Sequence, residues 1–207
     1  MTQPAPLLKT ILFDFGGVLL RTHDPSPRRR WEEKLGLAPG ELAAYIFNGP
    51  LGRQAQLGRA TWQAVWADAA RKFGLSAEEA ARAQRDFFSG DVLDRDLVAY
   101  LRRLKERYTI GLLSNTWHTD GRTLLLQFGI ADAFHFTVTS AEVGVMKPDP
   151  RIFHIALQRA NARPPEALFV DDFEENVLAA RKLGMQAVYF VEPETARARL
   201  VELTGVS

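Results

Sequence analysis

Cysteine is absent from the 207 residues of this chain, so neither a disulfide framework nor a thiolate metal site can form. Lysine is scarce: it supplies six of the 26 basic residues, which makes any lysine in an unusual setting more noticeable. Basic and acidic residues nearly cancel to a net charge of +1, so no overall field attracts nucleic acid or an anionic membrane. We therefore expect neither nucleic acid nor a membrane as a partner.

Long hydrophobic runs are missing as well. No run approaches the roughly 20 apolar residues that span a bilayer, and the opening stretch MTQPAPLLKT lacks the apolar core of a secretory signal. Apolar residues nevertheless make up 46% of the chain, enough for a substantial core. We expect a soluble, cytoplasmic protein with one domain, or one domain plus an insertion.

Short apolar runs rich in β-branched or aromatic residues predict five strands. The runs are nearly continuous rather than alternating, which is typical of parallel strands that are covered on both faces. They lie at residues 10–13, 109–113, 134–138, 167–170 and 186–191. Helical patterns separate the later runs, with Asp94 and Asp149 as N-caps. This alternation predicts an α/β fold, a Rossmann-like parallel sheet flanked by helices.

One interval, from about Arg21 to Gly90, carries helix signals and no convincing strand. Four helices are expected there, the last of them opened by the capping box Ser76–Glu79. A helical block of this length between the first and second strands indicates an insertion. We interpret residues 21–90 as a helical cap subdomain, and residues 1–20 together with 91–207 as the α/β core.

Polar residues follow four of the five predicted strands. In chain order they are Asp14, the pair Ser114-Asn115, Lys147, and the pair Asp171-Asp172. Each alone could be a turn, cap or surface residue. Ligands of open parallel sheets bind beyond the carboxyl ends of the strands, so in sheet order these residues predict one common site.

The chemistry of this set is coherent. Three converging carboxylates would repel one another in a partly dry site unless a cation joined them. Oxygen ligands in small number suit Mg²⁺, which keeps several waters and takes further ligands from a phosphate. Lys147 adds positive charge for an anionic substrate, and one carboxylate can serve as nucleophile.

Four ordered stretches, FDFGGVL, LLSNT, VMKPDP and VDDFEENVLAA, resemble the motifs of the haloacid dehalogenase (HAD) superfamily, and the helical insertion is similar to the cap of its type I members. The resemblance implies a hydrolase, most simply a Mg²⁺-dependent phosphatase of a small phosphate ester. It implies a metal site made of Asp14, the backbone carbonyl of Gly16, Asp172 and, beside it, Asp171. It implies catalytic roles for Asp14 as nucleophile and for Ser114 and Lys147, with Ser114, Asn115 and Lys147 binding the phosphoryl group.

The departure from the family pattern is Gly16. Most phosphatases of the family have a second aspartate there, which protonates the leaving oxygen, and loss of a general acid costs about 10²–10⁴-fold in rate. A glycine-bearing branch, which includes a sugar-1-phosphate phosphatase, resembles this chain, so a sugar phosphate is an expected substrate. Two alternatives stay open: a 2-haloacid dehalogenase, although those enzymes usually lack the acid found at Asp172, and a weakly active phosphate-binding scaffold.

Overall fold

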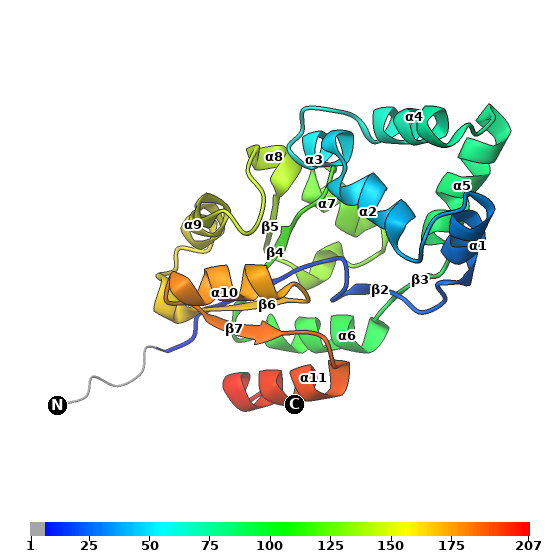
Figure 1. Cartoon of the computed structure of the whole chain (residues 1–207). Helices are drawn as coiled ribbons and strands as arrows, with labels where there is room; N and C mark the ends of the chain where they lie inside the picture. Colours follow the sequence, from blue (N-terminus) through cyan, green and yellow to red (C-terminus); the bar gives the residue numbers. More distant parts are fainter. Residues whose placement is uncertain (1–6) are drawn as a thin grey trace.

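A computed structural model describes residues 7–207 and shows a five-stranded parallel sheet in the order β5-β4-β1-β6-β7 (Figure 1). The predicted α/β class is confirmed. The strands of this sheet are β1 Thr10–Phe13, β4 Thr109–Ser114, β5 Phe136–Thr139, β6 Ala167–Asp171 and β7 Gln186–Tyr189. All five predicted runs are therefore strands, with bounds that differ from the prediction by up to two residues.

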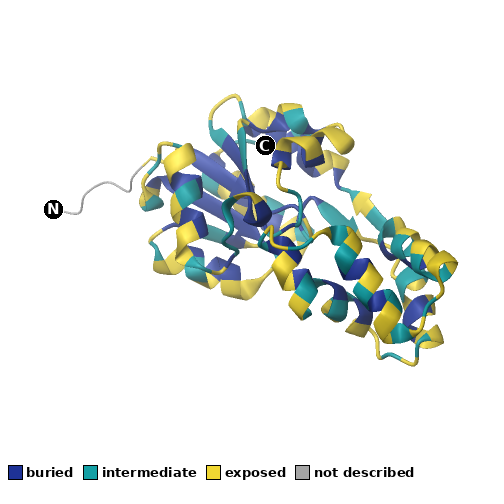
Figure 2. Ribbon diagram, turned by 90° about the horizontal axis from the view of Figure 1, so that it is seen from above, coloured by how far each residue is buried: buried dark blue, intermediate teal, exposed yellow. Residues whose placement is uncertain are grey.

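Strand β1 shows why a continuous apolar run becomes a central strand. Ile11 and Phe13 pack in one hydrophobic cluster with side chains of three helices, α6, α7 and α11. Leu12, which points to the opposite face, packs in a second cluster with α9 and α10. All three side chains are fully buried, and Figure 2 shows the buried sheet between its helical layers.

Helices complete the α/β core on both faces of the sheet. Their bounds are α6 Arg95–Leu104, α7 Gly121–Gln127, α8 Ser140–Val143, α9 Pro150–Arg159, α10 Glu174–Lys182 and α11 Pro193–Thr204, with short 3₁₀ helices at Ala131–Ala133 and Pro164–Glu166. Asp94 and Asp149 cap α6 and α9 through their side chains, as predicted. Among residues 7–207, no helix is both long enough and apolar enough to cross a membrane.

A helical subdomain, formed by α1–α5, lies beyond one end of the sheet (Figure 1). Its helices are α1 Ser26–Lys34, α2 Glu41–Asn48, α3 Pro50–Gln56, α4 Trp62–Phe73 and α5 Ala77–Ser89. They enclose a separate hydrophobic cluster centred on Ile46, Trp66 and Phe87. There are five helices rather than the four expected, because the backbone at Gly49 is extended and separates α2 from α3.

The two connections to the helical subdomain pair with each other. β2 (Leu20–Thr22) and β3 (Asp91–Leu93) form an antiparallel ribbon that the sequence analysis did not predict. Asp94, which directly follows β3, binds Arg21 of β2 at 2.9 Å and Arg197 of α11 at 2.5 Å. Since the Asp94 side chain is only 5% exposed, this ion-pair cluster ties both connections to the core.

Candidate active site

The central position of β1 brings three strand ends together. β1 pairs with β4 on one side and with β6 on the other, in parallel register. Asp14 follows the last residue of β1, Ser114 ends β4, and Asp171 ends β6. The sheet therefore presents these polar residues at one edge, as the sequence predicted, and all three are buried.

Lys147 reaches this edge from the segment that follows α8. Its Nζ lies 3.0 Å from Asp14 Oδ2 and 2.5 Å from Asp171 Oδ2, and its side chain has no exposed surface. Desolvation acts to lower the pKa of Lys147, but the charges of Asp14 and Asp171 outweigh it and raise the pKa above its ordinary value. The buried lysine is therefore a fixed positive charge between two carboxylates.

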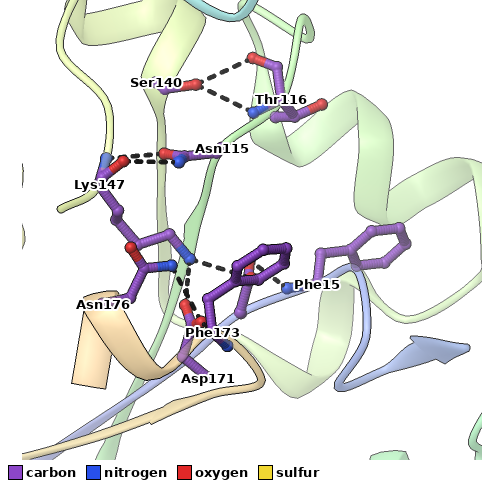
Figure 3. Close-up of polar contacts among 9 residues, drawn as sticks. Phe15, Asn115, Thr116, Ser140, Lys147, Asp171, Phe173 and Asn176 are labelled. Atoms are coloured by element: carbon purple, nitrogen blue, oxygen red, sulfur yellow. Dashed lines mark hydrogen bonds and ion pairs between the residues drawn. The ribbon is translucent and has the colours of Figure 1, made fainter. Parts of the chain in front are cut away.

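Both carboxylate oxygens of Asp171 accept hydrogen bonds from other groups of the protein. Its Oδ1 accepts hydrogen bonds from the Phe173 backbone N–H at 2.8 Å and from Asn176 Nδ2 at 3.0 Å. Its Oδ2 accepts from Lys147 Nζ, and Figure 3 shows these donors around the carboxylate. With both oxygens engaged, Asp171 is better suited to orienting Lys147 than to the metal-binding role expected from the sequence.

Asp14 and Asp172 carry the charge that the lysine does not balance. Burial raises the pKa of Asp14 to about 7, Asp171 and Asp172 add to the rise, and Lys147 opposes it. Burial likewise raises the pKa of Asp172 to about 6, with a further contribution from the charge of Asp171. The site thus holds more negative charge than one lysine compensates.

This donor set fits a divalent cation. Oxygen atoms of Asp14, Asp171 and Asp172 all lie within 4.8 Å of one another. Oδ1 of Asp172 is buried without a hydrogen-bond partner, a costly condition that a metal ion would relieve. Carboxylate oxygens are ligands that Mg²⁺ prefers, so Asp14 and Asp172 are the side chains suited to hold it.

Gly17 makes room for Asp172. A Cβ at Gly17 would lie 1.9 Å from Asp172 Oδ2, and the backbone there has a φ of +76°, which side-chain-bearing residues rarely adopt. Gly16 differs, because a Cβ at that position would meet no atom within 4 Å. The two adjacent glycines therefore have separate roles: close approach at Gly17 and open space at Gly16.

Gly17→Ala should weaken Mg²⁺ binding by about 10–100-fold, the usual effect of disturbing the surroundings of a metal ligand, because its Cβ displaces the Asp172 carboxylate. Isothermal titration with MgCl₂ measures this. Gly16→Ala is the matched control and should bind Mg²⁺ like the wild type. Equal affinities in Gly17→Ala and Gly16→Ala would show that Asp172 is not a ligand.

Asn115 and Ser140 fix the backbone around the site (Figure 3). Asn115 Oδ1 accepts from the Lys147 backbone N–H at 2.8 Å, and Asn115 Nδ2 donates to the Lys147 carbonyl at 3.0 Å. The amide is thus engaged with the lysine segment, which leaves one N–H on Nδ2 for the expected phosphoryl contact. Ser140, which the sequence analysis did not single out, binds both the N–H and the carbonyl of Thr116.

Comparison with known proteins identifies related sequences. Residues 8–184 match the profile of the haloacid dehalogenase-like hydrolases. D-ribitol-5-phosphate phosphatase of Bacteroides thetaiotaomicron is 29% identical over 215 residues, which cover 97% of this chain and 98% of that protein. Bifunctional epoxide hydrolase 2 of Rattus norvegicus is also 29% identical, over 96% of this chain, but this chain spans only 39% of that protein's length.

Solved structures share the fold. A HAD family enzyme of Bacteroides thetaiotaomicron, crystallised as an aspartate-to-alanine mutant with magnesium and inorganic phosphate, has a TM-score of 0.68 and 27% identity, covering 87% of this chain and 92% of that one. An L-2-haloacid dehalogenase of Xanthobacter autotrophicus has a TM-score of 0.63 and 21% identity, covering 97% of this chain and 85% of that one. At that lower identity the likeness concerns the fold alone.

Proposed function

The chain belongs to the haloacid dehalogenase-like hydrolases, and we propose that within this family it is a Mg²⁺-dependent phosphatase of a small phosphate monoester, with Asp14 as nucleophile. The observation that carries the proposal is the buried Lys147 between Asp14 and Asp171, next to an Asp172 oxygen that has no partner. Two comparisons support it: the match to the ribitol-5-phosphate phosphatase and the match to the enzyme crystallised with magnesium and phosphate.

The metal would be held by the Asp14 and Asp172 carboxylates and the backbone carbonyl of Gly16. When bound, Mg²⁺ supplies positive charge to the phosphoryl oxygens and favours the charged forms of the carboxylates. Asp171, whose oxygens are occupied, keeps Lys147 in place instead. Ser114 and the free N–H of Asn115 Nδ2 would bind the phosphoryl group.

In the first step, an Asp14 oxygen attacks phosphorus. The new O–P bond forms as the bond from phosphorus to the alcohol oxygen breaks, and that oxygen leaves with the electron pair and takes a proton from solvent. Lys147 stays 3.0 Å from Asp14 Oδ2, where its charge orients the nucleophile. Water then attacks phosphorus, the bond to Asp14 breaks, and inorganic phosphate and the free carboxylate are released with loss of a proton.

Gly16 determines which alcohols leave readily. It provides no carboxyl group to protonate the leaving oxygen, and general acid catalysis is typically worth about 10²–10⁴-fold. Esters whose alcohols need little protonation should therefore be favoured, such as anomeric sugar phosphates, acyl phosphates and aryl phosphates. We propose that the helical subdomain acts as a cap over the site and selects among these leaving groups.

Gly16→Asp should increase kcat/KM for simple alkyl phosphates by up to about 10²-fold, while anomeric and aryl esters gain little, because only poor leaving groups need a proton donor. A Cβ at position 16 would meet no atom within 4 Å, so there is room for the first atom of the new side chain. Gly16→Asn is the matched control, since it has the same shape but no acid, and it should give no gain. Equal gains for Asp and Asn, or for both ester classes, would contradict the explanation.

A phosphate-release screen over sugar, acyl, aryl and alkyl phosphates tests the proposed function itself. Release should require Mg²⁺, stop with EDTA and resume when Mg²⁺ is restored. The intact Asp172 argues against the dehalogenase alternative, which needs no metal. Chloride release from 2-chloropropionate without Mg²⁺, or no Mg²⁺-dependent phosphate release from any ester, would overturn the proposal.

A further inference from the structure

Trp117 links the α/β core to the helical subdomain. It lies three residues after Ser114, in the loop between β4 and α7, yet its ring packs against the hydrophobic cluster of α1–α5. The ring stacks on Trp62 of α4, with centroids 3.9 Å apart and planes 12° from parallel. It also faces Phe47 of α2 at 5.9 Å and Phe88 of α5 at 6.1 Å. One side chain from the loop between β4 and α7 thus contacts three helices of the subdomain.

The residue before Trp117 is held tightly. The Thr116 N–H donates to Ser140 Oγ at 2.9 Å, and Ser140 Oγ donates to the Thr116 carbonyl at 3.2 Å, with both residues buried (Figure 3). Asn115, one residue earlier, holds the backbone of Lys147. The loop therefore has little conformational freedom between the Trp117 ring and the residues that would bind the phosphoryl group.

The helical subdomain also meets the core next to Ser140. A Cβ at Gly58, just after α3, would lie 2.4 Å from the carbonyl oxygen of Ala141, so the two backbones touch. Ala141 is the neighbour of Ser140 in α8. These two contacts of the subdomain, the Trp117 stack and the Gly58 approach, thus fall on the two segments that the Thr116–Ser140 hydrogen bonds join.

We propose that Trp117 is a positioning residue that couples closure of the helical subdomain to the geometry of Ser114, Asn115 and Lys147. With its ring stacked on Trp62, the loop is held in the arrangement seen here. When the subdomain moves away, the ring loses its partners and the loop is free to relax. Coupling of this kind is reciprocal, so Mg²⁺ and phosphate bound at the site favour the stacked, closed state. The inference rests on the proposed function.

Trp117→Ala and Trp117→Phe test this role. Displacing a phosphate-binding loop by about 1 Å can cost 10²-fold, so Trp117→Ala should lose about 10–100-fold in kcat/KM, and Trp117→Phe, which keeps an aromatic ring, should recover part of it. Affinity for inorganic phosphate with Mg²⁺, measured by calorimetry, should fall in the same order. Trp66→Phe is the matched control, because Trp66 packs on Trp62 and Phe87 within the same cluster while leaving the Trp62–Trp117 stack intact.

Circular dichroism of the stacked indoles gives a readout that a merely structural role would not produce. Two indoles at 3.9 Å should give an exciton couplet. The contribution of the Trp62–Trp117 pair should be lost in Trp117→Phe, which keeps only that of Trp62 and Trp66 at 5.7 Å, and it should persist in Trp66→Phe. It should strengthen when Mg²⁺ and inorganic phosphate are added to the wild type. Thermal unfolding confirms that each variant is folded.

The outcomes separate the two proposals. Lack of phosphate release by the wild type would refute the proposed function, while phosphate affinity and the couplet still report on Trp117. If folded Trp117→Phe and Trp117→Ala lost the Trp62–Trp117 contribution to the couplet but kept wild-type kcat/KM and phosphate affinity, the coupling would be refuted and the function would stand. A couplet unchanged by Mg²⁺ and phosphate would also refute the coupling.

Discussion

Asp14→Asn protein should release phosphate at least about 10⁴-fold more slowly than the wild type, because a carboxamide cannot displace the leaving group, and removal of a covalent nucleophile usually costs this much or more. The fold should persist. Asparagine has nearly the shape of aspartate, and Lys147 keeps its contact with Asp171 at 2.5 Å. Initial rates with saturating Mg²⁺ and the best ester of the screen measure the effect.

Asp24→Asn is the control for the loss of one aspartate, because Asp24 is exposed and lies outside the site. Its rate should match the wild type. If Asp14→Asn kept more than a few per cent of the activity while Asp24→Asn was unaffected, Asp14 would not be the nucleophile, and the scaffold alternative would gain support.

Lys147→Met should cost both activity and stability. The substitution leaves two buried carboxylates, Asp14 and Asp171, without their cation, and breaking a buried ion pair typically costs about 3–5 kcal/mol. For a domain of this size that lowers the melting temperature by roughly 10 °C. Scanning calorimetry in EDTA measures the loss, and kcat/KM should fall because Asp14 and the phosphoryl group lose their compensating charge.

The stability deficit of Lys147→Met should shrink as the pH falls. The pKa of Asp14 is already raised to about 7 by burial, and Lys147 opposes that rise, so its loss raises the pKa further. Below about pH 7 the folded wild type carries this proton as well, so the two folded proteins differ in bound protons only between about pH 7 and the higher pKa of the variant. Lowering the pH from the alkaline range to about 7 should therefore reduce the deficit.

A double variant separates charge from packing. Lys147→Met combined with Asp171→Asn removes one of the two stranded carboxylates and should recover much of the stability without any activity. Lys72→Met, at an exposed position of α4, should change neither property. An unchanged melting temperature in Lys147→Met would contradict the buried ion-pair cluster as described.

The fold could be predicted where hydrophobic patterns are strong. The runs that became β1, β4 and β6 are buried along almost their whole length. Four ordered motifs and the helical insertion predicted the family, which the profile match confirms. The ribbon β2–β3 could not be predicted, because each strand has only three residues, none of them buried, and its partner lies about 70 positions away. The break between α2 and α3 depends on the backbone at Gly49, which no periodicity reveals.

The active site, like the fold, could be predicted from the sequence only in part. Strand ends predicted Asp14, Ser114 and Asp171-Asp172, because parallel strands place their carboxyl ends at one edge. The sequence could not reveal which hydrogen bonds each side chain makes. The Asp171 carboxylate accepts hydrogen bonds from Lys147, Phe173 and Asn176. The Asn115 side chain is hydrogen-bonded to the Lys147 backbone. Such assignments depend on side-chain directions that only the packed structure determines. Nothing in the sequence pointed to Trp117, because the rings that it packs against belong to the inserted helical subdomain, which is distant along the chain.

A crystal structure of the protein with Mg²⁺ and beryllium trifluoride tests whether one magnesium-bound phosphoryl group is held between Asp14, Asp172 and Lys147. Beryllium trifluoride on a carboxylate mimics the phosphoryl group. We expect beryllium bonded to an Asp14 oxygen, the metal in contact with Asp14 and Asp172, and Lys147 beside Asp14. Fluoroberyllate bound elsewhere or not at all, or a metal remote from Asp172, would contradict it.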